Sequence, residues 1–209
     1  MIENNDITVS VEQMRKSDAY TIEHLVSSKE LMHRAAMGVY NSYHEWQGKK
    51  IAILVGGGNN GGDGYALSGI LKKNVIDSDI IKVSDKMSED GAYYCNIASE
   101  LGVSITEFSS AINLNEYDVV VDCILGTGFQ GDVRGIARDA IEAINSSEAY
   151  VISVDINSGM NGDTGEATLA VISDLTVSIG YIKNGLATEV AKRYIKELVN
   201  VDIGIVLID

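Results

Sequence analysis

A stretch of ten residues with six glycines, Val55–Gly64, constrains this chain more than any other part of it. The apolar run Ile51–Val55 leads into it and has the character of a buried strand. Tyr65–Lys73 follows it, with apolar residues at helical spacing. A glycine-dense turn between a strand and a helix lets the backbone approach a ligand and directs free N–H groups at it. The alternative is a tight turn without a ligand, but six glycines are a large entropic cost for a connection alone.

The rest of the chain alternates between strand-like and helix-like segments. We expect helices over residues 11–23, 28–46, 65–73, 88–101, 132–145 and 188–198, and strands over 51–55, 80–83, 104–107, 119–122, 150–155, 175–179 and 201–207. This alternation predicts a Rossmann-like three-layer α/β/α sandwich with a mostly parallel central sheet. Because no linker or repeat interrupts it, we expect a single domain of residues 1–209, in which a helical segment, 10–46, packs on an α/β core, 50–209.

The composition excludes several classes of partner. The formal net charge of −14 argues against broad electrostatic binding to nucleic acid. No apolar run reaches the ~20 residues that span a bilayer, and Met1–Asn5 is too polar for a signal peptide. Cys95 and Cys123 are too few for a disulfide framework, so we expect both to be reduced. These features predict a cytoplasmic protein that binds neither membrane nor nucleic acid.

Three predicted strands end in polar, glycine-bearing turns, which are Asn59–Gly64, Asp122–Asp132 and Asp155–Gly165. In an open parallel sheet, ligands bind beyond the carboxyl ends of the strands, so we expect these turns to form one site. Asp122 and Asp155 directly follow apolar residues, where a carboxylate needs a partner or has a raised pKa. The alternative for either is a helix-capping or turn carboxylate.

The chemistry of these turns suggests a division of labour. Asp122, Asn60 and Ser158 could complete an oxygen-rich site with backbone carbonyls, which suits a weakly charged cation better than Zn²⁺. Asp155 would then be free for proton transfer.

Standard nucleotide motifs fit the glycine stretch poorly. Gly56-x-Gly58-x-x-Gly61 has the spacing of a dinucleotide fingerprint, but a lone match is weak, and no Gly-Lys-Ser/Thr follows. An NAD-dependent dehydrogenase would carry an acidic ribose-binding residue about 20 positions later. Asp77 and Asp79 come somewhat early for that role, and no substrate domain follows.

At these residues the sequence resembles the NAD(P)H-hydrate epimerase family, the YjeF N-terminal domain. The motifs that carry the resemblance are Gly58–Gly64, Asp122 with Gly126–Gly128, Val154–Gly159 and Asp163–Gly165, together with Met14-Arg15-x-x-Asp18 and Leu31-Met32-x-Arg34-Ala35 near the amino terminus. They cover nearly the whole chain. Asn157 replaces the usual proline of the family and Ala36 a usual glycine.

The resemblance implies an isomerase that interconverts the R and S epimers of hydrated NADH and NADPH (NADHX and NADPHX). It implies one potassium ion per subunit on Asn60, Asp122 and Ser158, and a catalytic role for Asp155. The residues implied to contact substrate are Asn59, Asn60, Gly61, Gly62, Asp63, Gly126, Thr127, Gly128, Phe129, Gln130, Gly131, Asp132 and Asp155, with Lys183 reaching a phosphate. A homodimer and a partner NAD(P)H-hydrate dehydratase are also implied, since no segment here resembles the fused dehydratase domain of many bacterial relatives.

Two readings of the resemblance remain open. Some relatives with this fold are non-catalytic scaffolds of the RNA-decapping or lipoprotein-binding type, which would tend to lose the cation and acid residues. Asn60, Asp122, Asp155 and Ser158 are all present here, which favours catalysis. In the catalytic reading, the ring nitrogen expels the hydroxyl, and water returns to the other face of a planar iminium. Asp155 would protonate the departing hydroxyl and deprotonate the incoming water.

Overall fold

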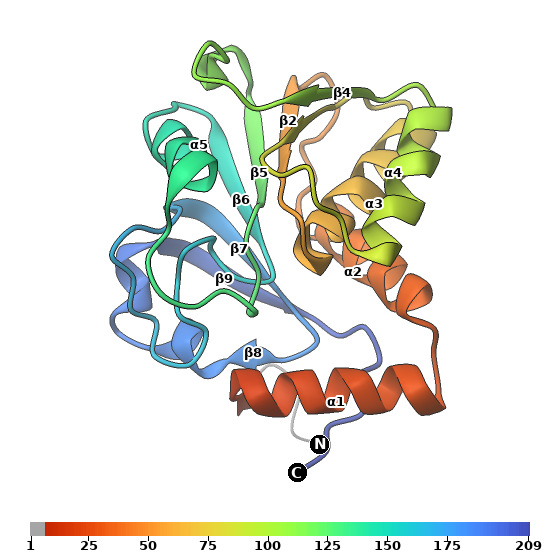
Figure 1. Ribbon diagram of the computed structural model, residues 1–209, viewed down its shortest axis with the longest axis vertical. Helices are drawn as coiled ribbons and strands as arrows, with labels where there is room; N and C mark the ends of the chain where they lie inside the picture. Colours follow the sequence, from red (N-terminus) through yellow and green to blue (C-terminus); the bar gives the residue numbers. More distant parts are fainter. Residues whose placement is uncertain (1–6) are drawn as a thin grey trace.

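A seven-stranded parallel sheet forms the centre of the computed structural model, which describes residues 7–209 (Figure 1). The order across it is β4-β3-β2-β5-β6-β7-β9. The strands are β2 (Ile51–Val55), β3 (Asp79–Lys82), β4 (Ser104–Glu107), β5 (Val119–Cys123), β6 (Tyr150–Val154), β7 (Ser173–Ile179) and β9 (Ile195–Val201). The segment Met1–Asn5, on which the expected lack of a signal peptide depends, lies outside the described residues.

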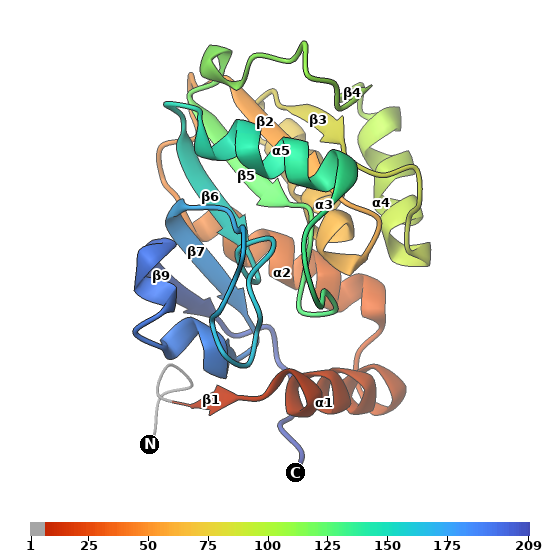
Figure 2. The ribbon, with the colours of Figure 1, turned by 60° about the vertical axis from the view of Figure 1, so that its left-hand side comes forward.

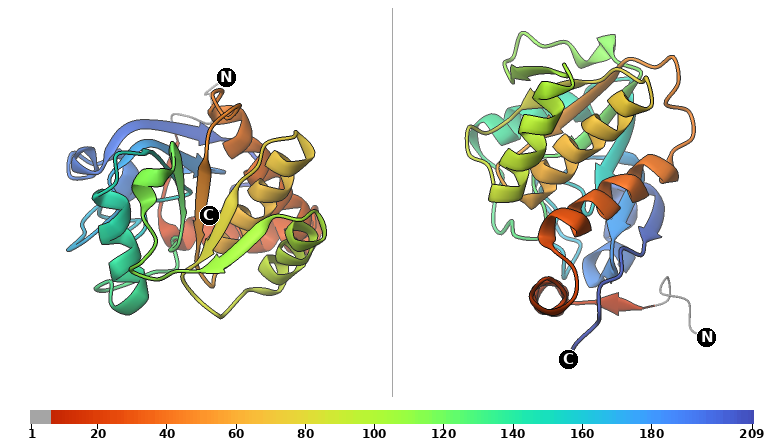
Figure 3. Two further views of the ribbon diagram at one scale, coloured as in Figure 1. Left: turned by 90° about the horizontal axis from the view of Figure 1, so that it is seen from above. Right: turned by 90° about the vertical axis from the view of Figure 1, so that its right-hand side faces the viewer.

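Helices cover both faces of this sheet. On one face lie α2 (Ser28–Ser42), α3 (Asn59–Lys73) and α4 (Glu89–Glu100), and on the other lies α5 (Gly135–Asn145), as Figure 3 shows from above. Strand β2 serves both layers, since Ile51, Ile53 and Val55 pack toward α2–α4 while Ala52 and Leu54 pack toward α5. The predicted three-layer sandwich with a parallel sheet is therefore confirmed.

Helix α1 (Val11–His24) lies apart from these layers, beyond the carboxyl ends of the strands (Figure 2). Ser10 caps it by accepting a hydrogen bond from the Gln13 N–H at 3.1 Å. The carboxyl-terminal tail holds its other side, because the Val206 and Ile208 N–H groups donate to the hydroxyls of Thr21 and Ser17 at 3.0 Å each. A two-stranded pair, β1 (Thr8–Val9) with β8 (Ile182–Lys183), fixes the start of the helix to the end of β7.

Several predicted boundaries in the first two thirds of the chain need correction. The second part of the glycine stretch is not a free turn, because α3 begins at Asn59 and includes Asn59–Gly64. Helix α2 ends at Ser42 rather than at residue 46. Trp46 lies beyond the helix and is buried, and its indole N–H donates to the Tyr40 carbonyl at 2.9 Å. Helix α5 begins at Gly135 rather than residue 132.

The last thirty residues depart most from expectation. The predicted helix over 188–198 is wrong: a 3₁₀ turn, Ala191–Arg193, leads into strand β9. In this segment Glu189 forms an ion pair with Lys192 at 2.6 Å. The predicted strand over 201–207 is also wrong, since β9 ends at Val201. Residues 195–201 form a strand because the edge of β7 offers them backbone hydrogen bonds in parallel register, and this pairing overrides their helical propensity.

Two absences concern the described residues, 7–209. None of the helices there has both the length and the apolar character needed to cross a bilayer. Cys95 and Cys123 are both free thiols, as their number in the sequence predicts.

Candidate functional site

The amino terminus of α3 opens onto the carboxyl end of the sheet, and its glycines allow that. A Cβ on Gly56 would lie 1.8 Å from the Ile124 carbonyl oxygen, and one on Gly61 would lie 2.1 Å from the Gly56 carbonyl oxygen. No side chain is therefore tolerated where β2, β5 and α3 meet. Gly58 precedes the helix without a side-chain cap, so the first N–H groups of α3 are available to an anion.

A pocket of about 520 Å³ lies between these strand ends and α1. The residues expected to contact substrate that line it are Asn59, Asn60, Asp63, Gly126, Thr127, Gly128, Phe129 and Asp155. Helix α1 contributes Met14, Arg15 and Asp18 to its wall. The predicted Gly61 and Gly62 are instead buried within α3, where Gly62 packs against Met32.

The three predicted cation ligands converge beneath this pocket. The Ser158 hydroxyl donates to Asp122 Oδ1 and accepts from the Leu125 N–H at 2.7 Å. The Asn60 amide donates to the Leu125 carbonyl at 3.0 Å, and its own Oδ1 is buried with no hydrogen-bond partner among the described residues. A buried acceptor without a donor is costly. A cation bound here by oxygen atoms would satisfy it, so the residues fit potassium.

Asp122 is fully buried on β5 and is satisfied by neutral donors alone. The Ser158 N–H and the Ser153 hydroxyl each donate to Oδ2 at 2.9 Å, and the Ile124 N–H donates to Oδ1 at 3.2 Å. Burial raises the pKa of Asp122 above its ordinary value, while these bonds and that from the Ser158 hydroxyl lower it. The carboxylate is thus anchored without a cationic side chain.

Asp155 follows β6 and is held quite differently. Its backbone lies in the left-handed region, with φ at 67°, and its N–H donates to the Val177 carbonyl at 2.8 Å. The buried ammonium of Lys183 forms an ion pair with Oδ1. A Cβ built on Gly126 would lie 4.0 Å from Oδ2, which places that oxygen beside the loop that lines the pocket.

Lys183 was expected to reach a phosphate of the substrate, but its side chain is buried and points to groups of the protein itself. Its side chain is only 1% exposed, and its ammonium donates to the Ile179 carbonyl at 2.8 Å and to the Ser178 hydroxyl at 3.4 Å, besides Asp155. Three acceptors occupy its three N–H bonds. The geometry therefore directs Lys183 to Asp155 and not to a phosphate.

Two further carboxylates face Asp155 across the pocket. Burial, followed by the charges of Asp155 and Asp18, raises the pKa of Asp63 well above its ordinary value. Burial and the charge of Asp155 raise the pKa of Asp18 as well, and the Lys183 ammonium lowers both. Asp18 was not among the predicted site residues, although the spacing Met14-Arg15-x-x-Asp18 on α1 could have indicated it.

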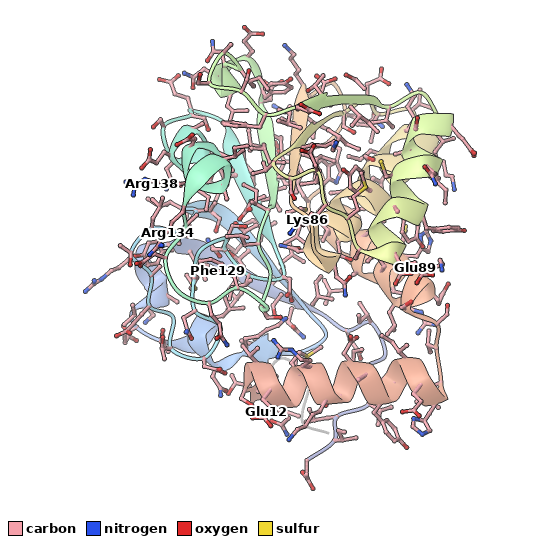
Figure 4. All side chains as sticks on the ribbon, viewed as in Figure 1. Glu12, Lys86, Glu89, Phe129, Arg134 and Arg138 are labelled. Atoms are coloured by element: carbon pink, nitrogen blue, oxygen red, sulfur yellow. The ribbon has the colours of Figure 1, made fainter. Side chains whose placement is uncertain are left out.

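The remaining expected substrate contacts line a second hollow of about 630 Å³. Gln130, Gly131 and Asp132 belong to it, and Phe129 lines both hollows. Figure 4 shows Phe129 on the loop between β5 and α5. Asp132 accepts a hydrogen bond from the Thr168 hydroxyl at 2.8 Å. The predicted contacts are thus divided between two hollows that share Phe129.

Asn157, where the family usually has proline, has a structural role that the sequence did not indicate. Its buried amide donates to the Val171 carbonyl at 2.9 Å and to the Ser173 hydroxyl at 3.0 Å. Its Oδ1 accepts from the Thr176 hydroxyl at 2.7 Å. These bonds tie the turn that carries Asp155 and Ser158 to β7, so the replacement leaves the site anchored.

Comparison with known proteins gives a consistent result over most of the chain. The family described as YjeF-related protein N-terminus matches residues 28–185. NAD(P)H-hydrate epimerase of Oenococcus oeni is 34% identical over 206 residues, which are 95% of this chain and 97% of the relative. That of Limosilactobacillus reuteri (strain ATCC 55730 / SD2112) is 34% identical over 93% of this chain and 94% of its own.

Of two other matches, one is to a longer relative and the other is to a solved structure with a similar fold. The bifunctional NAD(P)H-hydrate repair enzyme Nnr of Coxiella burnetii is 32% identical over 90% of this chain, which corresponds to 39% of that enzyme. The crystal structure of the yeast protein YNL200c superposes with a TM-score of 0.75 at 20% identity and covers 92% of this chain and 88% of the yeast chain. The latter is a likeness of fold.

Proposed function

This chain belongs to the YjeF-related protein N-terminus family, and we propose that it is an isomerase that interconverts the R and S epimers of NADHX and NADPHX. The curated relatives that it matches over nearly their full length are NAD(P)H-hydrate epimerases. One observation of the structure supports this most directly: an oxygen-rich cluster at Asn60, Asp122 and Ser158 and a carboxylate at Asp155 meet at one pocket.

The proposed reaction needs a proton donor and acceptor close to the hydrated carbon of the ring. The ring nitrogen expels the hydroxyl as its C–O bond breaks, and a proton from Asp155 makes it water. A water molecule then attacks the planar iminium from the other face and returns its proton to the carboxylate, so atoms and charge balance. The open Oδ2 of Asp155 suits this exchange, which in enzymes contributes ~10²–10⁴-fold to a rate.

The dinucleotide itself carries a diphosphate that must be bound in an acidic protein. The uncapped amino terminus of α3 offers N–H groups and the positive end of a helix dipole at Gly58 and Asn59. We propose one potassium ion on Asn60, Asp122 and Ser158 in each subunit; when bound, it would add positive charge and hold the turns together. Its fit depends on the unpaired Asn60 Oδ1.

The cellular setting is a proposal too. A bifunctional relative has the name of a repair enzyme and is longer than this chain, so we propose that a separate NAD(P)H-hydrate dehydratase consumes one of the epimers. We further propose that the chain acts as a homodimer in the cytoplasm, where free Cys95 and Cys123 would stay reduced.

The test is an epimerisation assay with one purified epimer of NADHX or NADPHX. We expect the chain to bring the two epimers to equilibrium far faster than the spontaneous reaction, and faster in potassium than in a buffer without it. The alternative, a non-catalytic scaffold or ligand-binding module of the same fold, predicts the spontaneous rate under every condition. Equal rates with and without the chain would overturn the proposal.

A further inference from the structure

The buried lysine at the end of β8 has no part in the reaction as described so far. Lys183 is among the largest fully buried side chains, and a buried ammonium is stable only with a good partner. Its partner is Asp155, the residue that directly follows β6. The pairing thus joins a carboxylate at the pocket to a cation behind it.

The surroundings of Lys183 hold its ammonium in one place. Residue Gly180 turns the chain after β7 with φ at 76°, and the Ser178 hydroxyl donates to the Tyr181 carbonyl at 3.0 Å across this turn. Strand β1 pairs with β8 at Val9 and Lys183. The backbone of Lys183 is held by this pairing, and its ammonium is held by the Ile179 carbonyl. The side chain therefore has little freedom to extend into the pocket.

The two oxygens of Asp155 have different surroundings as a result. Oδ1 is taken by Lys183, while Oδ2 lies beside Gly126 at the pocket. We propose that Lys183 is a positioning residue that holds Asp155 by one oxygen, so that the other oxygen faces the substrate for the exchange of a proton. This inference rests on the proposed epimerase function.

The Lys183 ammonium also acts on the pKa of two other carboxyl groups that line the pocket. Asp18 on α1 and Asp63 on α3 face Asp155, and Arg15 on α1 and Asp90 on α4 line the same pocket. Lys183 lowers the pKa of both Asp18 and Asp63, which burial and Asp155 raise. Without this cation, Asp18, Asp63 and Asp155 would compete for protons more strongly.

The decisive variants are Lys183→Met, which keeps the length and removes the charge, and Lys183→Arg, which keeps the charge. For Lys183→Met we expect kcat to fall at least about tenfold at neutral pH with KM little changed. The limb of the kcat/KM profile that reports Asp155 should move to higher pH, because a carboxyl group without a neighbouring cation holds its proton more tightly. Lys183→Arg should recover part of the rate. The exposed Lys192→Met is the matched control and should leave both unchanged.

Two other outcomes would overturn the inference. A raised KM with unchanged kcat and pH profile would assign Lys183 to substrate binding. A smaller active fraction with an unchanged pH profile would assign it a structural role alone.

A measurement without substrate separates this inference from the proposed function. Urea unfolding of Asp155→Asn, Lys183→Met and the double variant gives a double-mutant cycle, in which we expect the losses to be strongly non-additive. Additive losses would overturn the pairing. A wild-type chain without epimerase activity would overturn the proposed function, while the cycle would still decide whether Lys183 and Asp155 act as a unit.

Discussion

Asp122 and Asp155 stand at the ends of adjacent parallel strands, and the protein treats them in opposite ways. Asp122 is fully buried and receives hydrogen bonds from hydroxyl and N–H donors alone. Asp155 has a side chain 19% exposed and is paired with an ammonium. Two carboxylates that look alike in the sequence therefore have different electrostatic surroundings.

The difference shows how one sheet edge can separate binding from proton transfer. Neutral donors anchor a carboxylate and leave its charge available to a bound cation. A cation behind a carboxylate balances that charge and leaves one oxygen for a proton. Changes at Asp122 should therefore act on stability and potassium binding, and changes at Asp155 on the rate of epimerisation and its pH dependence.

The largest effect is expected for Asp155→Asn. Asparagine tolerates a positive φ, so the backbone is preserved, but the amide cannot exchange the proton. We expect epimerisation to slow by ~10²–10⁴-fold, measured as interconversion of the two epimers at saturating and limiting substrate. The exposed Asp77→Asn is the control. A variant with near-full rate and unchanged affinity would remove Asp155 from the chemistry.

A loss of stability is expected next, for Asp122→Ala. Four buried donors would lose their acceptor, which should lower the free energy of unfolding by ~2–4 kcal/mol. Urea denaturation measures this loss, with Asp85→Ala as an exposed control. An unfolding free energy equal to that of the wild type would mean that the donors find other partners, and the contrast with Asp155 would weaken.

Potassium should stabilise the wild type and Asp155→Asn alike. At ~10–100 times its Kd, a ligand bound only by the folded state adds ~1–3 kcal/mol. Thermal unfolding in potassium against a large organic cation at equal ionic strength measures the gain. We expect Asn60→Ala to abolish it, because the unpaired Oδ1 is then gone. Stabilisation that survives in Asn60→Ala would place the ion elsewhere.

The smallest effect concerns Asp63 and pH. Its folded-state pKa is raised, so the folded protein holds the proton more tightly than the unfolded chain. This contribution to stability is complete below the ordinary pKa of 3.8 and is lost as pH rises through the folded-state value. Asp63→Asn should therefore gain in Tm over the wild type as pH rises from about 4 to 8. A constant difference in Tm would contradict this.

The regular half of the fold could be predicted because its signals are local. Apolar runs such as Ile51–Val55 and Val119–Val121 are strands in any parallel sheet, and the glycine stretch could lie only where backbones meet closely. The three polar turns also pointed to one site. Residues 188–198 could not be predicted, because their helical propensity is overridden by the free edge of β7.

By itself, the sequence determined the layered parallel fold, the place of the site at the strand ends and the oxygen-bearing residues that gather there. Only the tertiary structure decided which groups touch. It brought Lys183 to Asp155, placed Asn157 as a tie to β7, and set Asp18 of α1 over the pocket. The physical reason is that charge pairing, burial and hydrogen bonding between distant segments depend on distances in space, which strand order and the edges of the sheet set.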